Sequence, residues 1–354
     1  MSQLPEAQNS SPEGQLLASR WDQKDASGLS KRDALLKQLR RDKKWNGTKD
    51  LRYIRFEKEN LSGVDLSGAD LTGASLSESN FSQANLTGVN LSLAKIDHCE
   101  FMGANLSRAN LAGAISNFSG FGVANLSSVN FFGAKFKQVT LTRADLSKSD
   151  FRASDLSGTR IRDANLTNAV FSNANLKRCE LEGSSLAGAD FNNANLKKAS
   201  LKGLKHYQKA NWIGTDIRGI DFHGAYLIRR FIMDQNYLHE FRTQSKAHEI
   251  IYKIWLLTSD CGRSFMRWLI IIVFLTFLFA VLFSLVPMDW GAHGDSFFAP
   301  LYFSVVTITT LGYGDITPTT LAGELLTVLE VAFGYCSLGG LMSIFATKMG
   351  KRAD

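Results

Sequence analysis

The sequence has few cysteines, and its first residues lack an apolar stretch. Four cysteines are scattered over 354 residues, which is too few for a disulfide framework. We expect them to be reduced, with Cys99 and Cys179 in a protein core. The first thirty residues are polar and do not resemble a cleavable signal peptide. The N-terminus is therefore predicted to stay in the cytoplasm.

A strongly charged segment is also lacking. The net charge of +7 divides into +3 for residues 1–50, +6 for 51–230 and −2 for 231–354. Apart from the run between Lys197 and Lys209, Lys and Arg are spread thinly and form no basic stripe with aromatic residues to stack on bases. We therefore expect no nucleic-acid partner.

Residues that carry out chemistry are scarce as well. The histidines at 98, 206 and 223 have no metal-like partners at regular spacing, and the many Asp and Asn are better explained as turn formers than as acid/base pairs. The sequence offers no nucleophile with a base, no cluster of metal ligands and no phosphate-binding loop. We expect neither enzyme activity nor a cofactor.

A period of five residues dominates the sequence from Leu51 to Leu201. Every fifth position carries Leu, Phe or Ile, with Ser116 as the exception, and each is preceded by a small residue and then an Asn- or Asp-rich position. This period fits neither ordinary element, because the large residues would rotate by about 140° per step on a helix and change faces on a strand. The chain must turn once per unit to bring them to a common axis.

This pattern resembles the pentapeptide-repeat family, whose fold is a right-handed quadrilateral β-helix with four units per coil. The resemblance implies such a β-helix over residues 51–230, with a one-residue insertion near Lys205 or His206 that shifts the register. Residues 1–29 are predicted to be disordered, and 30–50 to form a helix that caps the open end.

Two later segments are apolar enough to cross a membrane. Trp268–Val286 is uncharged, and Leu325–Ala346 contains one charge, Glu330, so we predict spanning helices at 266–286 and 321–347. Basic residues precede the first and follow the second, which predicts that both termini are cytoplasmic.

The linker at 231–264 is predicted to contain a helix that lies in the inner membrane interface, because several apolar residues share one of its faces. Between the two spans, the apolar segment 297–310 is too short to cross, so the chain must enter and leave on one face of the membrane. It leads into Thr-Leu-Gly-Tyr-Gly-Asp at residues 310–315.

The run at 310–315 resembles the potassium-channel signature, and residues 265–348 are similar to a two-helix channel pore domain. The resemblance implies a pore helix at 297–310 and a filter that coordinates K+, the one metal ion expected, through four copies of the loop in a homotetramer. It assigns the filter to Thr310, Leu311, Gly312, Tyr313 and Gly314. Leu311 stands where Val is commonest, which changes the packing behind the filter and leaves its carbonyl unchanged in kind.

The resemblance also suggests residues that support or gate the filter. Tyr302 is predicted to hold Asp315 from behind. Gly334 matches the inner-helix hinge, although a close helix contact is an equal alternative. For Glu330 the alternatives stay open: it attracts cations, senses protons, is simply neutral, or is bonded to the pore helix as a brace. One stripe of the second span is expected to line the cavity, namely Tyr335, Leu338 and Met342.

The sequence therefore predicts a multidomain, tetrameric membrane protein, with a pentapeptide-repeat β-helix before an all-α pore domain in the inner or plasma membrane. The expected function is passive K+ conduction, and the repeat region is expected to serve a structural role, gating or the binding of an unknown cytoplasmic protein. The alternative is a membrane-anchored repeat scaffold whose pore conducts poorly or not at all.

Overall fold

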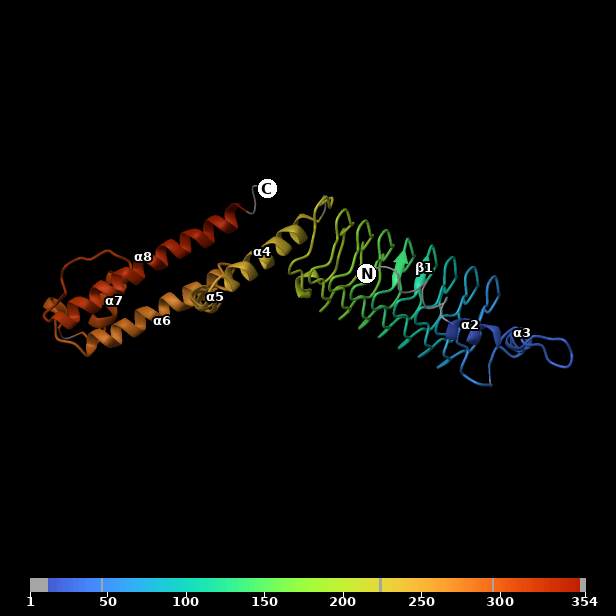
Figure 1. The fold of residues 1–354 in the computed structure, drawn as a ribbon. Helices are drawn as coiled ribbons and strands as arrows, with labels where there is room; N and C mark the ends of the chain where they lie inside the picture. The colour runs from blue at the N-terminus through green and yellow to red at the C-terminus, as the bar shows by residue number, and fades with distance from the viewer. Residues whose placement is uncertain (1–11, 46, 223–224, 295, 351–354) are drawn as a thin grey trace. The chain divides into compact units, whose positions relative to one another are not determined.

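The computed structural model describes most of the chain, namely residues 12–45, 47–222, 225–294 and 296–350 (Figure 1). By its internal contacts the chain divides into two compact units, Met1–Tyr237 and Leu238–Asp354.

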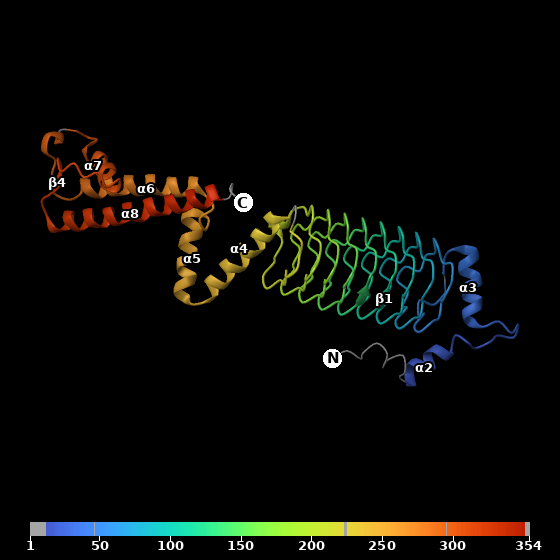
Figure 2. The ribbon, with the colours of Figure 1, turned by 90° about the horizontal axis from the view of Figure 1, so that it is seen from above.

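The first unit is a stack of coils. Parallel bridges pair residues that are twenty positions apart, such as Asn85 with Asn105. One pair of short strands, β1 (Ile115–Asn117) and β2 (Lys135–Lys137), shares this register, and Figure 2 shows the successive coils side by side. Four five-residue units therefore make one coil, so equivalent side chains of neighbouring coils lie above one another.

The large residues of the period fill the axis of the stack. Phe131, Phe151, Phe171 and Phe191 form a column in which neighbouring ring centroids are 4.4, 4.8 and 4.9 Å apart. All four side chains are fully buried. Ser116, the exception in the sequence pattern, is buried too, and its hydroxyl lies 3.4 Å from the carbonyl oxygen of Ile96. The period of five is thus explained by burial of one large side chain per turn.

Turn chemistry explains the small and polar positions. The second residue after each large one commonly takes a left-handed conformation, as Gly68 (φ 64°) and Lys148 (φ 59°) do. Asn110 shows the role of Asn: its Oδ1 accepts a hydrogen bond from the Ala112 N–H at 3.2 Å and another from Asn130 Nδ2 of the next coil at 3.0 Å. Asn therefore stabilises both its own turn and the neighbouring coil.

Helix α3 (Lys31–Asp42) covers the N-terminal end of the stack, and α2 (Pro12–Ser19) precedes it in the chain. Helix α3 buries Leu35, Leu36 and Leu39, and an unpaired end of a coil stack needs such a cover.

The prediction of disorder over residues 1–29 is wrong from residue 12 onward, and residues 1–11 lie outside the described part of the chain. Trp21 explains the order: its side chain is buried, and its indole N–H donates to the Arg52 carbonyl oxygen at 2.9 Å. Beside it, Arg20 pairs with Asp50 at 2.7 Å. These bonds fix the segment before α3 to the first coil.

The insertion predicted near Lys205 or His206 is present in the last coil. Pairing keeps a spacing of twenty from Asp50 with Asp70 up to Ser185 with Lys205, and then changes to twenty-one between Asp190 and Asn211. The first pair, Lys44 with Asp65, is also twenty-one residues apart. The extra residue is taken up by a short 3-10 helix, η1 (Tyr207–Lys209).

Helix α4 (Tyr226–Thr243) closes the C-terminal end of the stack. It buries Ile228 and Ile232, and two of its amides bond to the backbone of the last coil. Gln235 Oε1 accepts from the Trp212 N–H at 2.6 Å, and Asn236 Oδ1 accepts from the Gly214 N–H at 2.7 Å. Residues 231–237 therefore belong to the repeat unit, and not to a linker that begins at 231.

The second unit contains four helices: α5 (Lys246–Ser259), α6 (Phe265–Ser284), α7 (Ala299–Ile308) and α8 (Leu321–Gly350). Helix α6 and residues 321–346 of α8 are long and apolar enough to cross a membrane, with mean hydropathies of 2.5 and 1.6. By themselves two such helices are weak support for a membrane protein. Several apolar side chains of α5 are exposed, namely Ile250, Ile251, Ile254 and Leu257.

Helix α7 packs against both long helices, which lie side by side (Figure 2). Phe303 of α7 meets Phe283 of α6 edge to face, with ring centroids 4.8 Å apart. The segment around α7 starts and ends at one place, because β3 (Met288–Asp289) pairs with β4 (Thr317–Pro318) in antiparallel register. The short 3-10 helix η2 (Gly291–His293) follows β3.

Candidate functional site

The loop after α7 contains the residues with the strongest functional signal. Helix α7 is shorter than the predicted 297–310: it begins at Ala299 with Pro300 in its first turn and ends at Ile308, and Thr310 after it takes a left-handed φ of 60°. Gly312 (φ 53°) and Gly314 (φ 77°) are left-handed too, whereas Leu311 and Tyr313 are not. Left-handed residues thus alternate with residues of ordinary φ along 310–314.

The loop at 310–314 is exposed in the single chain. Leu311 is 60% exposed and Tyr313 66% exposed. An added Cβ at Gly312 or Gly314 would meet nothing within 4 Å. Exposure of large apolar side chains to water is unfavourable. It therefore indicates that other protein packs around this loop.

Asp315 is held from two sides. The Tyr302 hydroxyl of α7 donates to Asp315 Oδ2 at 2.8 Å, and His293 Nε2 of η2 lies 3.3 Å from the same oxygen. The Tyr302 hydrogen bond is the main cause of a lowered pKa of Asp315, and His293 contributes less. The predicted pair of Tyr302 and Asp315 is thus hydrogen-bonded in the structure.

Sequence reasoning missed His293, because a single His in a polar loop shows no period or motif. Its ring centroid lies 5.1 Å from that of Tyr302. The nearest signal is Gly291, two residues earlier, which takes φ 51° and approaches the backbone of Asp315 so closely that an added Cβ would lie 2.6 Å from its carbonyl oxygen.

Gly334 lies where α8 crosses the end of α7. A Cβ added at Gly334 would overlap the carbonyl oxygen of Ile308, the last residue of α7. By contrast, Gly339 has open space around it. The geometry favours close contact as the reason for glycine at 334, and its role as a hinge stays a prediction.

Three further residues of α8 were expected to line a cavity. Tyr335, Leu338 and Met342 are 63%, 57% and 64% exposed. These three side chains therefore form an exposed stripe of α8, which is available to line the predicted cavity.

Glu330, also on α8, is different because it is fully buried. Its Oε1 is hydrogen-bonded to the hydroxyl group of Ser304 on α7. No period or motif in the sequence identifies Ser304 as this partner.

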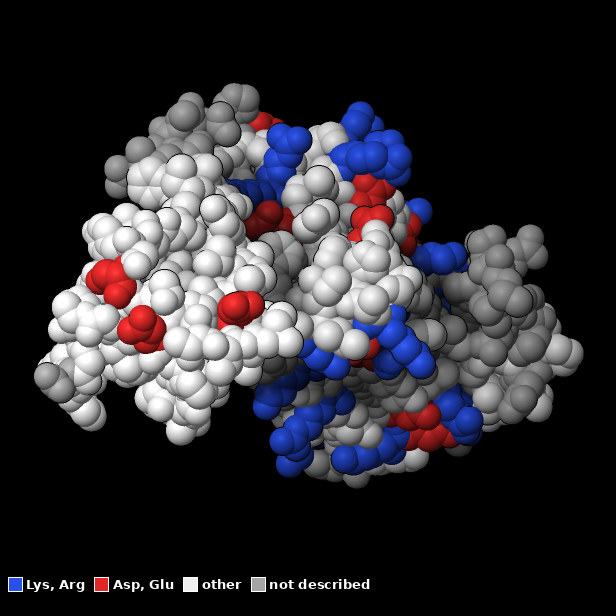
Figure 3. All heavy atoms as spheres, turned by 90° about the vertical axis from the view of Figure 1, so that its left-hand side faces the viewer, with Lys and Arg blue, Asp and Glu red and all other residues white. Residues whose placement is uncertain are grey.

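The part of the second unit around the loop after α7 carries acidic side chains but no Lys or Arg. The sequence contains no Lys or Arg between Arg267 and Lys348, but that stretch includes Asp289, Asp315 and Glu324. Figure 3 views the molecule from the end that carries α7, and the near surface is uncharged apart from a few carboxylates. Such a surface raises the local concentration of cations.

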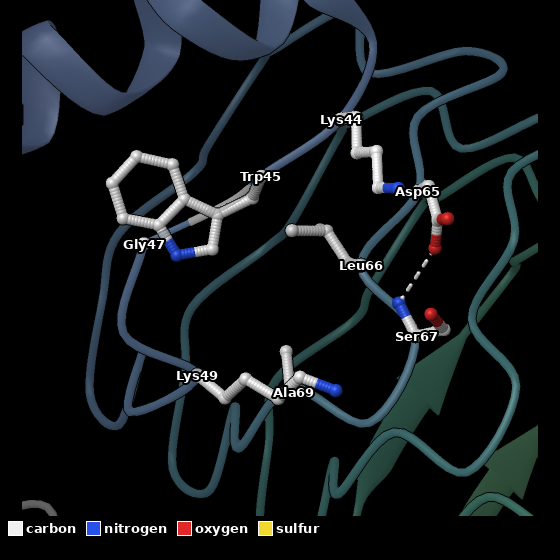
Figure 4. A pocket seen from close by; sticks show the side chains of 8 residues that line it. All are labelled: Lys44, Trp45, Gly47, Lys49, Asp65, Leu66, Ser67 and Ala69. Atoms are coloured by element: carbon white, nitrogen blue, oxygen red, sulfur yellow. Dashed lines mark hydrogen bonds between the residues drawn. The ribbon is translucent and has the colours of Figure 1, made fainter.

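A pocket lies at the N-terminal end of the repeat unit (Figure 4). Lys44, Trp45 and Lys49 line it together with Asp65 and Ser67. The Asp65 carboxylate is already used, because its Oδ1 accepts from the Ser67 N–H at 3.0 Å, a bond that lowers the pKa of Asp65. We therefore assign no ligand to this pocket.

Comparison with known proteins agrees with both halves of the sequence. Residues 268–351 match the family model described as "Ion channel". Residues 60–92 match "Pentapeptide repeats", and 124–201 match "Pentapeptide repeat region". The chain combines a potassium-channel domain with pentapeptide repeats.

Relatives of the channel domain include two proteins of Methanocaldococcus jannaschii. "Probable potassium channel protein 2" is 48% identical over 54 residues, which are 15% of this chain and 16% of that protein. "Hyperpolarization-activated voltage-gated potassium channel" is 51% identical over 39 residues, which are 11% of this chain and 19% of that protein. The chain thus matches less than a fifth of the length of either relative.

Solved structures resemble the repeat half. Trypsin-treated QnrB1, described as a plasmid-mediated fluoroquinolone resistance protein, is 20% identical with a TM-score of 0.38, covering 51% of this chain and 95% of its own. HetL, a pentapeptide repeat protein of the cyanobacterium Nostoc, is 28% identical with a TM-score of 0.23, covering 49% of this chain and 85% of its own. Scores this low support no conclusion about function.

Proposed function

We propose that the chain is one subunit of a homotetrameric channel that passes K+ passively across a membrane. The observation that carries the proposal is the loop after α7, in which residues 310–314 alternate in handedness and stand exposed. A single loop supplies one quarter of each coordinating ring, so four copies must surround one axis. Packing of four chains also accounts for the exposure of Leu311 and Tyr313 in one chain.

In this proposal each predicted site residue has one role. Carbonyl oxygens of the filter replace the water around K+, which is the one metal ion involved and the permeant species. Asp315 and Tyr302 support the filter from behind, and their hydrogen bond of 2.8 Å favours this role. Gly334 fits the inner helix to the pore helix, and one stripe of α8 lines the cavity. The filter consists of Thr310, Leu311, Gly312, Tyr313 and Gly314, and the cavity stripe of Tyr335, Leu338 and Met342.

We place the protein in the cell membrane, with α6 and α8 spanning the bilayer and both termini in the cytoplasm. The pairing of β3 with β4 supports this topology, because it returns the chain to the place where the intervening segment began. The repeat unit, which we take to be a right-handed quadrilateral β-helix, then has a structural or gating role in the cytoplasm, or binds a cytoplasmic protein.

Ion flux in liposomes tests the proposal. We expect the purified full chain to be tetrameric by light scattering and to let K+ through much faster than Na+. Gly312→Ala should abolish or strongly reduce K+ flux, because a left-handed Ala costs about 1–2 kcal/mol in each of four subunits. Gly339→Ala is the matched control, since its Cβ would meet nothing. A monomeric protein, or equal flux of Na+ and K+, would overturn the proposal and favour the membrane-anchored scaffold.

A further inference from the structure

Glu330 is a carboxyl group buried among three helices. Its side chain is inaccessible to solvent, Oε1 is hydrogen-bonded to Ser304 Oγ of α7, and Oε2 has no hydrogen-bond partner in the described part of the chain. Ser304 is itself fully buried, and its Oγ lies 2.8 Å from the carbonyl oxygen of Thr276 on α6. One hydroxyl group therefore links α6, α7 and α8.

Counting protons decides how these bonds are made. A serine hydroxyl has one proton, and a backbone carbonyl can only accept. The Ser304 proton is therefore used in the bond to Thr276. Each of the two bonds has a proton of its own when the carboxyl group donates to Ser304 Oγ, which requires the neutral, acid form of Glu330.

The surroundings of Glu330 agree with a neutral group. A buried carboxylate is costly unless it is paired with a cation or accepts several hydrogen bonds. The described chain supplies one bond to Oε1 and none to Oε2. The ionisable side chains on the three helices have no bond or ion pair to Glu330 among the described contacts. They are Arg267 on α6, Tyr302 on α7, and Glu324, Tyr335 and Cys336 on α8.

The bond to Ser304 is accompanied by a second close contact between α7 and α8. Gly334 follows Glu330 by four residues, and Ile308 follows Ser304 by four, so the close approach of Gly334 to the Ile308 carbonyl lies one helical turn further along both helices. Ile308 is the last residue of α7, two residues before the filter begins. The two contacts together fix the position and the rotation of α7.

We propose that Glu330 is a positioning residue that acts as a neutral carboxylic acid. Its proton joins α8 to Ser304, and with Gly334 it holds the pore helix, and through it the filter, in one geometry. This role excludes the attraction of cations by a Glu330 carboxylate, because the acid has no charge at the pH where it braces α7.

Substitutions at Glu330 separate these roles by the ratio of K+ to Na+ flux in liposomes, a test that rests on the proposed function. Glu330→Gln keeps a hydrogen-bond donor of the same shape, so we expect a flux ratio within about twofold of the wild type. Glu330→Ala should lower the ratio by about tenfold or more, because one buried hydrogen bond is lost. Ser304→Ala should follow Glu330→Ala. Glu324→Gln, which removes the exposed carboxylate of α8, is the control and should leave the ratio unchanged.

The pH profile adds a readout that mere packing would not change. A rise in pH ionises the acid and breaks its bond to Ser304, so the wild type should lose selectivity at alkaline pH while Glu330→Gln keeps it. The proposal is overturned if Glu330→Gln behaves like Glu330→Ala, or if the two pH profiles coincide up to the pH at which the protein unfolds.

Infrared spectroscopy tests the proton directly and does not require conduction. The purified full chain at neutral pH should show the C=O stretch of a protonated carboxylic acid, and this band should be missing in Glu330→Gln and unchanged in Glu324→Gln. Absence of the band in the wild type would overturn the neutral state even in a channel that conducts K+. Its presence in a protein without flux would contradict the proposed function alone.

Discussion

In the second unit, single residues determine how closely two segments approach or provide one hydrogen bond between them. Gly334 leaves room for the Ile308 carbonyl, and Tyr302 donates to Asp315. Each contact joins the pore helix or the loop after it to a different partner, so each can be removed separately. Two predictions follow at this scale.

Gly334→Ala should destabilise the second unit. The new methyl group would overlap the Ile308 carbonyl, and inserting a methyl into a packed contact costs about 1–3 kcal/mol. Gly339→Ala has free space and better helix propensity, so it should be neutral or slightly stabilising. Thermal unfolding of both variants in detergent checks this. Equal stability of the two variants would show that α8 can move away from α7 without cost.

Tyr302→Phe should make the filter more sensitive to acid. The Tyr302 hydrogen bond lowers the pKa of Asp315, so the contribution of this carboxylate is present above its ordinary pKa and is lost as the pH falls through the lowered value. Without the hydroxyl the pKa rises toward its ordinary value, and K+ flux should be lost at a higher external pH than in the wild type.

His293→Gln provides the comparison for Tyr302→Phe. His293 contributes less to the pKa of Asp315, so we expect a smaller shift of the flux profile in the same direction. Superimposable profiles of Tyr302→Phe and the wild type would contradict a role of this hydrogen bond at the filter.

The helices and coils differ in how they end. A coil stack exposes a row of backbone donors and acceptors at each end, and here α4 covers one such row with side-chain amides. Both amides make two such bonds: Gln235 accepts from Trp212 and donates to the Ala210 carbonyl oxygen at 3.3 Å, and Asn236 accepts from Gly214 and donates to the Trp212 carbonyl oxygen at 3.0 Å. Helix α4 is therefore a structural part of the repeat unit.

Asn236→Ala should destabilise the repeat unit by about 1–3 kcal/mol, because it leaves the Gly214 N–H and the Trp212 carbonyl oxygen without these partners. Chemical denaturation of the full chain, followed by the fluorescence of its tryptophans, measures the effect. Met233→Ala, at an exposed position of the same helix, should change stability by less than about 0.5 kcal/mol. A similar loss in both variants would mean that the helix, and not the amide, provides the cap.

The sequence predicted regular parts of these elements and missed the irregular ones. The period of five determines which side chains are buried, so the core of the repeat could be predicted from Leu and Phe alone. Gln235 and His293 could not, because their roles depend on contacts with distant backbone or side chains that no local period encodes. Trp21 was missed for a similar reason: the polar segment around it concealed one buried aromatic.

At the scale of the whole molecule, two units with different solvents share one chain. The first is stabilised by its own column of Phe and Leu and carries its own caps, and the second contains both apolar helices and the filter loop. The boundary between Tyr237 and Leu238 lies inside α4 and keeps the Gln235 and Asn236 cap with the repeat unit, whereas a cut at 230 removes this cap.

Deletion of residues 1–237 should therefore leave a tetramer that still prefers K+ to Na+, because the filter and its supports lie in residues 238–354. Flux through the truncated and the full chain in matched liposomes measures any contribution of the repeat unit to gating. A truncated chain that forms tetramers but has lost its preference for K+ would assign filter geometry to the repeat unit.

The spacing of twenty residues between paired positions has a consequence for how such a chain can change. Any insertion inside the stack that is not a whole coil moves later Leu and Phe side chains away from their column. The extra residue at η1 lies near the C-terminal end of the stack, where two more bridged positions, Asn211 and Asp216, follow. Duplication or loss of twenty residues keeps every column intact and changes the length by about 4.8 Å. The repeat unit can thus act as a ruler that is lengthened or shortened in fixed steps while both of its capped ends stay the same.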